Sequence, residues 1–154
     1  MKLLIVDDDS LICSSLARGL IRLGHAGRAA RSVESALKMI ESESPSAVLT
    51  DLDLGPGGDG VELLARMRRE GCQVPAIMMT GSDPALARAR LARAGLDEIA
   101  LLVKPFAFDE LMKVLGEVLP GDASVAAARG RAPRLTPVAA LVDKVAHLFG
   151  GRAP

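Results

Sequence analysis

The sequence predicts an α/β fold in which a five-stranded parallel sheet carries helices on both faces. Two observations support this prediction: short apolar runs alternate with segments of helical periodicity, and five of each fit within residues 1–119. Strands that alternate with helices of this size form right-handed βαβ units, which build parallel sheets. The chain has 154 residues, 49% of them hydrophobic and 25% charged, so it can bury a core of its own.

The predicted strands are short runs with few polar residues. The run at 3–6 is wholly apolar, as in a strand buried on both faces of a sheet. Similar runs occupy 47–50, 75–79 and 100–103, and a weaker strand is predicted at 27–30. We therefore expect the four strong strands to form the buried part of the sheet.

A helix is predicted after each strand, and most helices carry their own start or stop signals. The first helix can start at Asp9 or Ser10 and stops at Gly24, and Ser32 starts the second. The glycine-rich loop at 55–60 leads into the third helix. Asp83 and Pro84 start the fourth, which ends at Gly95, and Asp109 and Glu110 start the fifth, which Pro120 closes. The glycines of the loop are expected to serve its turn, because no Lys-Ser or Lys-Thr follows as in a phosphate-binding loop.

Composition excludes several classes of protein. The two cysteines, Cys13 and Cys72, form no Cys-x-x-Cys motif, so neither a disulfide framework nor a zinc site is expected. The longest apolar runs, such as 74–79, are far shorter than the ~20 residues that cross a membrane. Three acidic residues at 7–9 end the first apolar run too early for a signal peptide, so we expect a cytoplasmic protein.

The composition changes at residue 120. Residues 1–119 carry 14 basic and 17 acidic side chains, whereas residues 120–154 carry five basic and two acidic ones. We expect a flexible linker over 120–136 and an amphipathic helix over 137–149, whose apolar stripe could dock on its own domain, on a second copy or on another protein. The segment is too short for a DNA-binding output domain of the helix-turn-helix kind, so DNA binding is not expected.

Polar residues able to do chemistry follow each strong strand. They are Asp7, Asp8 and Asp9 after the first, Asp51 after the third, Thr80 after the fourth and Lys104 after the fifth. Parallel strands bring these ends to one edge of the sheet, where ligands bind in open α/β folds. Carboxylates so close together need a cation, and an oxygen-only ligand set suits Mg²⁺ or Mn²⁺. The pattern predicts a Mg²⁺-dependent site that forms an acyl phosphate on an Asp.

At these residues the chain resembles the receiver domain of two-component response regulators, especially the single-domain regulators of the chemotaxis kind. The resemblance covers residues 1–119 and rests on five motifs in order: Ile5-Val6-Asp7-Asp8-Asp9, Leu49-Thr50-Asp51-Leu52-Asp53, Asp59-Gly60-Val61-Glu62-Leu63, Met79-Thr80-Gly81 and Val103-Lys104-Pro105-Phe106. It implies a flavodoxin-like, doubly wound sheet with strand order 2-1-3-4-5.

The resemblance also implies a role for each residue of the site. Asp51 is the expected phosphoacceptor, and Lys104, Thr80 and the Gly81 N–H are expected to hold the phosphoryl oxygens. Asp8 and Asp51 are expected to bind the metal directly, Asp53 through its backbone carbonyl and Asp7 mostly through water. The side chains of Asp53 and Ser82 are expected to tune dephosphorylation.

Three features depart from the family pattern. Leu101 stands where the family has an aromatic switch residue, so Thr80 cannot couple to a ring there, and Leu101 is predicted to be core. The loop from Asp51 to Asp59 and the stretch from Gly95 to Lys104 are both longer than usual. These departures affect the surface formed by the fourth helix, fifth strand and fifth helix.

The resemblance implies a response regulator that receives its phosphoryl group from a sensor histidine kinase or a histidine phosphotransferase. It would signal through an unidentified downstream protein. A homodimer is also possible, either through the fourth helix, fifth strand and fifth helix or through residues 137–149. The alternatives are a small phosphatase similar to the haloacid dehalogenases and an interaction module that works without phosphorylation. Arg88, Arg90 and Arg93 are expected to form a solvated face of the fourth helix.

Overall fold

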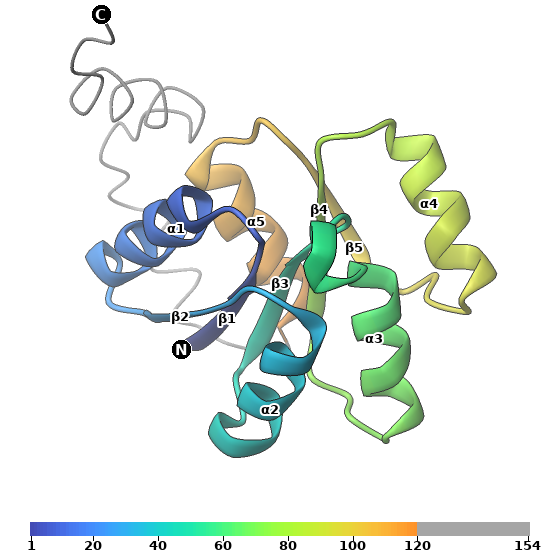
Figure 1. Cartoon of the computed structure of the whole chain (residues 1–154). Helices are drawn as coiled ribbons and strands as arrows, with labels where there is room; N and C mark the ends of the chain where they lie inside the picture. The colour runs from blue at the N-terminus through green and yellow to red at the C-terminus, as the bar shows by residue number, and fades with distance from the viewer. Residues whose placement is uncertain (120–154) are drawn as a thin grey trace, which may run out of the picture.

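The computed structural model describes residues 1–119, which form a five-stranded parallel sheet between two layers of helices (Figure 1). The strand order is β2-β1-β3-β4-β5, as the resemblance implied. The elements in chain order are β1 (Lys2–Val6), α1 (Ser10–Arg22), β2 (Ala26–Ala30), α2 (Val33–Glu43), β3 (Ala47–Asp51), the 3₁₀ turn η1 (Gly55–Gly57), α3 (Gly60–Arg69), β4 (Ala76–Thr80), α4 (Pro84–Arg93), β5 (Ala100–Val103) and α5 (Phe108–Val118).

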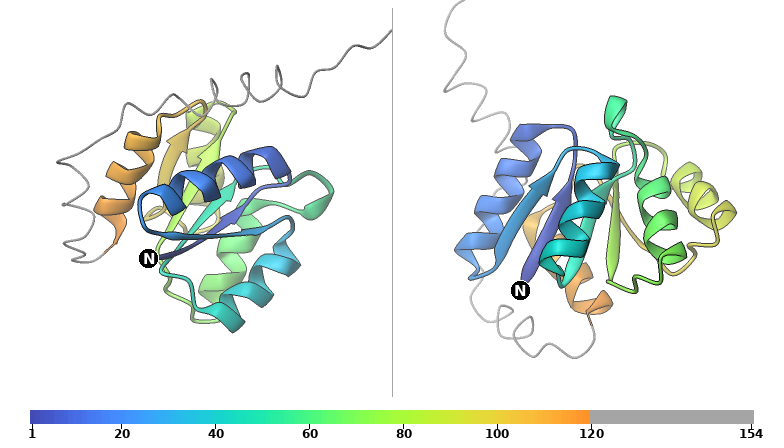
Figure 2. Two further views of the ribbon diagram at one scale, coloured as in Figure 1. Left: turned by 90° about the vertical axis from the view of Figure 1, so that its left-hand side faces the viewer. Right: turned by 60° about the horizontal axis from the view of Figure 1, so that its bottom comes forward.

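Side chains alternate between the two faces of the sheet and build two separate cores. Leu3 and Ile5 of β1 pack with buried residues of α1 and α5, such as Leu16 and Leu111. Leu4 and Val6 point to the other face. There they pack beside residues of β3 and β4, and α2, α3 and α4 cover this face of the sheet. Figure 2 shows the sheet from two further sides, with helices on both of its faces. Because both faces of β1, β3 and β4 are buried, these strands are mostly apolar, and the polar residues Asp7, Asp51 and Thr80 fall at or just after their carboxyl ends.

The predicted elements are confirmed, with small shifts at their ends. Strand β3 extends one residue to Asp51 and β4 extends one residue to Thr80, so both residues are held in the regular sheet. The weak strand prediction at 27–30 corresponds to β2, an edge strand that pairs only with β1. Its signal is weak because most of its residues are small and partly exposed.

Side-chain caps fix the loops that follow β1, β2, β3 and β4. Asp9 caps α1, Ser32 caps α2, Asp59 caps α3 and Asp83 caps α4, each by accepting backbone N–H groups of the first turn. Helix α5 begins without a side-chain cap, but Asp109 and Glu110 lie in its first turn as predicted. Pro120, which was predicted to close this helix, lies outside the described residues.

The glycine-rich loop serves both a turn and a close contact. Gly55 and Gly58 adopt positive φ angles of 54° and 111°, which confirms that these two glycines serve the turn. Gly57 and Gly60 have a different reason: a Cβ at Gly57 would collide with the Arg31 carbonyl oxygen, and one at Gly60 with the Asp51 carbonyl oxygen. The loop is therefore pressed against the end of β3 and the start of α2.

The predicted linker at 120–136 and helix at 137–149 lie outside the described residues. Among the helices that the structure describes, none has the length and apolar character to cross a membrane.

Candidate functional site

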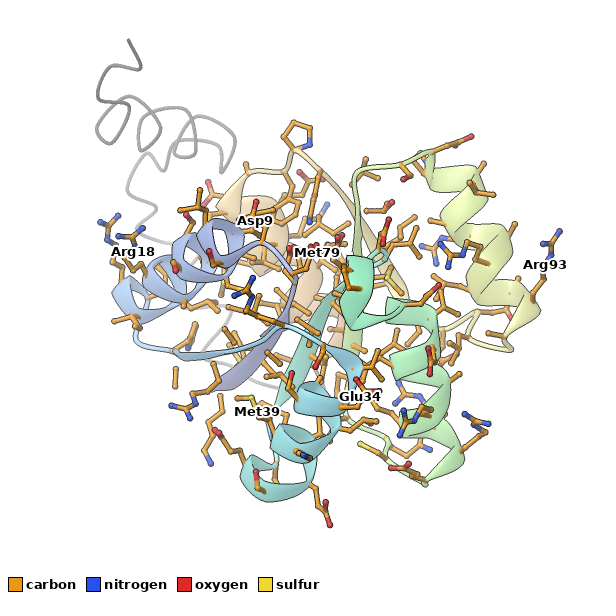
Figure 3. All side chains as sticks on the ribbon, viewed as in Figure 1. Asp9, Arg18, Glu34, Met39, Met79 and Arg93 are labelled. Atoms are coloured by element: carbon orange, nitrogen blue, oxygen red, sulfur yellow. The ribbon has the colours of Figure 1, made fainter. Side chains whose placement is uncertain are left out.

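The site lies at the carboxyl edge of the sheet, where four strands deliver the residues that the sequence predicted. Asp7 follows β1, Asp51 ends β3, Thr80 ends β4 and Lys104 follows β5. In Figure 3, Asp9 and Met79 mark this edge, because Asp9 ends the acidic run that begins at Asp7 and Met79 directly precedes Thr80. The neighbouring order of β1, β3, β4 and β5 thus gathers residues that are up to 97 positions apart in the chain.

Three carboxylates form the anionic part of the site. One oxygen from each of Asp7, Asp8 and Asp51 lies within 4.8 Å of the others. Asp7 is almost fully buried, Asp51 is half-buried and Asp8 is exposed, so the cluster opens to solvent on one side. Like charges at this distance repel, and a hard divalent cation with some retained water relieves the repulsion. The donor set therefore fits Mg²⁺, or Mn²⁺ with the same ligand preference.

Lys104 supplies the cationic part of the site. Its Nζ donates a hydrogen bond to Asp7 Oδ2 at 2.8 Å and lies 3.1 Å from Asp51 Oδ1. Burial by itself would lower the pKa of Lys104, but the hydrogen bond to Asp7 and the charges of Asp51 and Asp7 outweigh it and raise the pKa. Lys104 is therefore an ammonium group at neutral pH, placed directly beside the Asp51 carboxylate.

Asp51 is held in an environment that disfavours its charge. Burial raises the pKa of this carboxyl above its ordinary value, and the charge and hydrogen bond of Lys104 oppose the rise without cancelling it. The pKa of Asp51 is raised further by the charge of Asp7. A carboxylate that is poorly compensated gains from any added cation, which is the electrostatic reason to expect metal binding here.

Thr80 and the loop after it form another side of the site. Thr80 is fully buried, and its Oγ1 accepts a hydrogen bond from the Ser82 N–H at 3.0 Å. Gly81 is exposed, and a Cβ built on it would meet nothing within 4 Å. The fold itself therefore does not require glycine at 81, and the backbone of this loop has open space around it.

Asp53 lies in the loop after β3 with its backbone held in place. The backbone of Asp53 pairs with that of Asp59 in an isolated antiparallel bridge. The two hydrogen bonds of this bridge run from the Gly60 N–H to the Leu52 carbonyl and from the Leu54 N–H to the Gly58 carbonyl. The bridge therefore leaves the Asp53 carbonyl unused, as a backbone metal ligand requires, while the Asp53 side chain accepts the Gly55 N–H at 2.9 Å.

Two expectations about the neighbouring surface have different outcomes. Leu101 is half-buried and packs against the core between the sheet and α2, α3 and α4, as predicted. The prediction of a solvated arginine face on α4 is confirmed for Arg88 and Arg93, which are both exposed, but Arg90 is half-buried and paired. Arg88 donates to the Ile99 carbonyl at 2.7 Å, and Arg90 forms an ion pair with Asp59, because the loops beside α4 bring acceptors within reach of both side chains.

Sequence analysis missed one residue that supports the site. Arg31, directly after β2, donates from Nη2 and Nε to the Asp8 carbonyl at 3.0 and 3.3 Å. No local signal identifies this contact, because it depends on the pairing of β2 with β1. The position of Arg31 immediately after a strand was the only available clue.

Comparison with known proteins agrees with this geometry. The family model of the response regulator receiver domain matches residues 3–116. A response regulator MprA of Mycobacterium avium is 36% identical over 112 residues, covering 73% of this chain and 48% of the relative. One from Mycobacterium tuberculosis is 34% identical over 128 residues, covering 80% of this chain and 54% of the relative. The chain thus spans about half the length of these curated relatives.

Solved structures show the same fold. The receiver domain of NtrX from Brucella abortus superposes with a TM-score of 0.68 at 30% identity, covering 76% of this chain and 97% of that one. A CheY-like receiver domain protein from Methanospirillum hungatei gives a TM-score of 0.67 at 29% identity, covering 75% and 90%. The fold, the acidic edge and the sequence match lead to one conclusion: the chain belongs to the response regulator receiver domain family.

Proposed function

We propose that this receiver domain accepts a phosphoryl group on Asp51, with Mg²⁺, from a phosphohistidine of a sensor histidine kinase or histidine phosphotransferase. The observation that carries the proposal is the position of the Asp51 carboxylate, 3.1 Å from the Lys104 ammonium and within 4.8 Å of the Asp7 and Asp8 oxygens. A nucleophile between a cation and a metal-binding cluster is suited to attack on phosphorus.

The proposed transfer forms one bond and breaks another. An oxygen of Asp51 attacks the phosphorus, the O–P bond forms, and the N–P bond to the donor imidazole breaks with its electron pair staying on nitrogen. Lys104 faces the phosphoryl oxygens and offsets their charge. A Mg²⁺ held by Asp8, Asp51 and the Asp53 carbonyl, with Asp7 acting through water, would supply further charge stabilisation when bound.

The residues around Thr80 would hold and time the phosphoryl group. The Thr80 hydroxyl, now bonded to the Ser82 N–H, would turn to a phosphoryl oxygen, and the Gly81 N–H would donate to another. This exchange would bias an equilibrium between inactive and active conformations. The side chains of Asp53 and Ser82 are both exposed beside the site, where they could order or exclude the water that attacks the acyl phosphate.

The output would be a phosphorylation-dependent contact with a downstream protein, without DNA binding by residues 1–119, and the place of action would be the cytoplasm. A homodimer through α4, β5 and α5 is compatible with this output. The ring that usually couples Thr80 to this surface is replaced by Leu101, so the coupling would have to use other contacts of α4.

Intact mass measurement after incubation with acetyl phosphate tests the proposal. We expect one phosphoryl adduct that needs both Mg²⁺ and Asp51, and none on Asp51→Asn. A folded protein that binds Mg²⁺ but forms no adduct would contradict phosphorylation and favour an interaction module. Consumption of acetyl phosphate without an adduct leads to a turnover assay on a phosphomonoester, in which repeated turnover would establish the phosphatase alternative.

A further inference from the structure

A groove between α2 and α3 lies away from the carboxyl edge of the sheet. Its volume is about 640 Å³, and its apolar lining comes from Leu37, Ile40, Met67, Cys72 and Val74. Apart from Met67 these side chains are only half-buried, so apolar surface in the groove still meets water. Covering it with another apolar surface would gain roughly 25 cal/mol for each Å² buried.

The groove differs from the other exposed apolar positions of the described chain. Leu11, Ile21, Leu86 and Val103 are all at least 40% exposed, but they are scattered over α1, α4 and β5. Single exposed apolar side chains are ordinary on a protein surface. The groove instead gathers five side chains from two helices and a loop, which is the arrangement of a binding surface.

Residues 137–149 have the sequence of a helix that needs such a surface. Thr136 and Pro137 are suited to a helix start, and an apolar stripe follows at helical spacing: Val138, Leu141, Val142, Val145, Leu148 and Phe149. An isolated helix of this length is marginal in water. Its stability would therefore have to come from the burial of the stripe.

We propose that residues 137–149 pack as a helix into the α2–α3 groove of the same chain. Helices of a parallel sheet run back to the edge where the strands begin, so α2, α3 and α5 all end at that edge. The groove runs along α2 from Glu34 to Ser44, and the last turn of α3 with the loop after it closes its other side, so one end of the groove lies at that edge. Figures 1 and 2 show α5 on the face of the sheet opposite α2 and α3. The segment 120–136, which connects α5 to the predicted helix, therefore has to pass around the edge of the sheet.

The segment 120–136 between α5 and the predicted helix is long enough to reach the groove. A flexible segment the length of 120–136 has a root-mean-square span of roughly 20–25 Å. A domain of about 120 residues has a radius of gyration of only about 13 Å. The predicted helix can therefore reach the groove without strain, and the same tether keeps its local concentration high.

Charge also favours contact within one chain. Residues 1–119 have a net charge of −3 and residues 120–154 a net charge of +3, from the counts of 14 against 17 and five against two. Exposed Glu41 and Glu70 stand on the rim of the groove together with exposed Lys38, and Arg66 on the same rim faces Glu34 at 3.8 Å, so three acidic and two basic side chains leave the rim with a net charge of −1. Arg129, Arg131 and Arg134 directly precede the predicted helix and would lie near this rim.

The Cys72 thiol in the groove lining allows a direct test in the full chain. Val145→Cys places a thiol on the apolar stripe, and His147→Cys places one two residues away on the opposite side of the helix. We expect mild oxidation to form a 72–145 disulfide within monomers at least about tenfold faster than a 72–147 disulfide. Non-reducing electrophoresis and peptide mass mapping identify the bonds, and Cys72→Ser gives the background.

A second measurement uses no cross-link. Val145→Asp would remove the helix from the groove, and we expect Cys72 to be alkylated several-fold faster than in the wild type or in His147→Asp. Equal disulfide rates at 145 and 147, with no change in alkylation, would overturn the proposal. Disulfide-linked dimers that form in preference to monomers would also overturn it, because they would assign the groove to the helix of a second copy.

Discussion

Arg90 of α4 forms an ion pair with Asp59, the residue that caps α3. One carboxylate oxygen of Asp59 accepts the Val61 N–H at 2.7 Å, and the other accepts from the guanidinium. The backbone of Asp59 pairs with that of Asp53, two residues beyond the proposed phosphoacceptor. The ion pair therefore connects α4 to the loop that follows β3. This connection does not depend on the aromatic ring that Leu101 replaces.

Substitutions at Asp59 should separate its two roles. Asp59→Ala loses the helix cap and the ion pair, and we expect the free energy of unfolding to fall by about 1–2 kcal/mol. Asp59→Asn keeps a capping side chain and loses only the charge, so the fall should stay below about 1 kcal/mol for a pair that is partly exposed. Urea unfolding measures both values.

A double-mutant cycle tests whether Arg90 acts through Asp59. Arg90→Gln should lose no further stability in the Asp59→Asn background, because the interaction is already absent there. Arg93→Gln is the matched control, since Arg93 is an exposed arginine of the same helix. The specific ion pair would be contradicted if the stability losses of Arg90→Gln and Asp59→Asn were additive in the double mutant. It would also be contradicted if Arg93→Gln lost as much stability as Arg90→Gln.

Substitution by alanine should destabilise the protein at Gly60 and leave its stability unchanged at Gly81. A Cβ at Gly60 would collide with the Asp51 carbonyl oxygen, which cannot move without displacing the end of β3. We expect Gly60→Ala to lower the free energy of unfolding by about 1–3 kcal/mol and to slow adduct formation with acetyl phosphate.

Gly81→Ala is the matched control, because a Cβ there meets nothing within 4 Å. Its unfolding free energy should stay within about 0.5 kcal/mol of the wild type. A large loss at 81, or a neutral result at 60, would mean that the close contact between the loop and β3 does not constrain the site.

Asp51→Asn should make the metal-free protein more stable at pH 7. Burial raises the pKa of Asp51 above its ordinary 3.8. A carboxyl with a raised folded-state pKa contributes stability when protonated, and this contribution is lost as the pH rises through that pKa. The carboxylate therefore destabilises the fold at neutral pH, and a neutral amide should remove the cost.

Urea unfolding with and without Mg²⁺ checks this prediction. Mg²⁺ should stabilise the wild type by about 2.7 kcal/mol at one hundred times its dissociation constant, and Asp51→Asn by much less. Asp97→Asn, an exposed change away from the cluster, should respond to Mg²⁺ as the wild type does. A metal-free Asp51→Asn that is less stable than the wild type would contradict the electrostatic account.

The fold and the core of the site were predictable for the same physical reason. A strand buried on both faces is a short apolar run, and its polar end is conspicuous in the sequence, as at Asp51 and Thr80. Parallel pairing then brings those ends together. Strand β2 gave a weak signal because an edge strand of small, partly exposed residues lacks this contrast.

Contacts that depend on the packing of distant elements were not predictable. Arg31 reaches the Asp8 carbonyl 23 positions away, and Arg90 reaches Asp59 31 positions away. An arginine on a helix looks the same in the sequence whether it meets solvent or a carboxylate. The close approach of Gly60 to Asp51 was also hidden, because glycines in a turn do not show which of them has a neighbour at its Cβ position.

The alkaline stability of the domain should depend on Cys13. This thiol is 4% exposed and donates to the Asp7 carbonyl at 3.4 Å. Burial, and then the charge of Asp7, raise its pKa from 9.0 to about 11. The protonated thiol is thus favoured in the folded state, so its contribution is present below pH 9 and is lost as the pH rises towards 11. Over that window the free energy of unfolding of the wild type should fall on the order of 2 kcal/mol more than that of Cys13→Ala.

Urea unfolding at a series of pH values measures the slope of stability against pH for both proteins. Cys72→Ser is the control and should keep the wild-type slope, whereas equal slopes for the wild type and Cys13→Ala would show that the Cys13 thiol titrates normally in the folded protein.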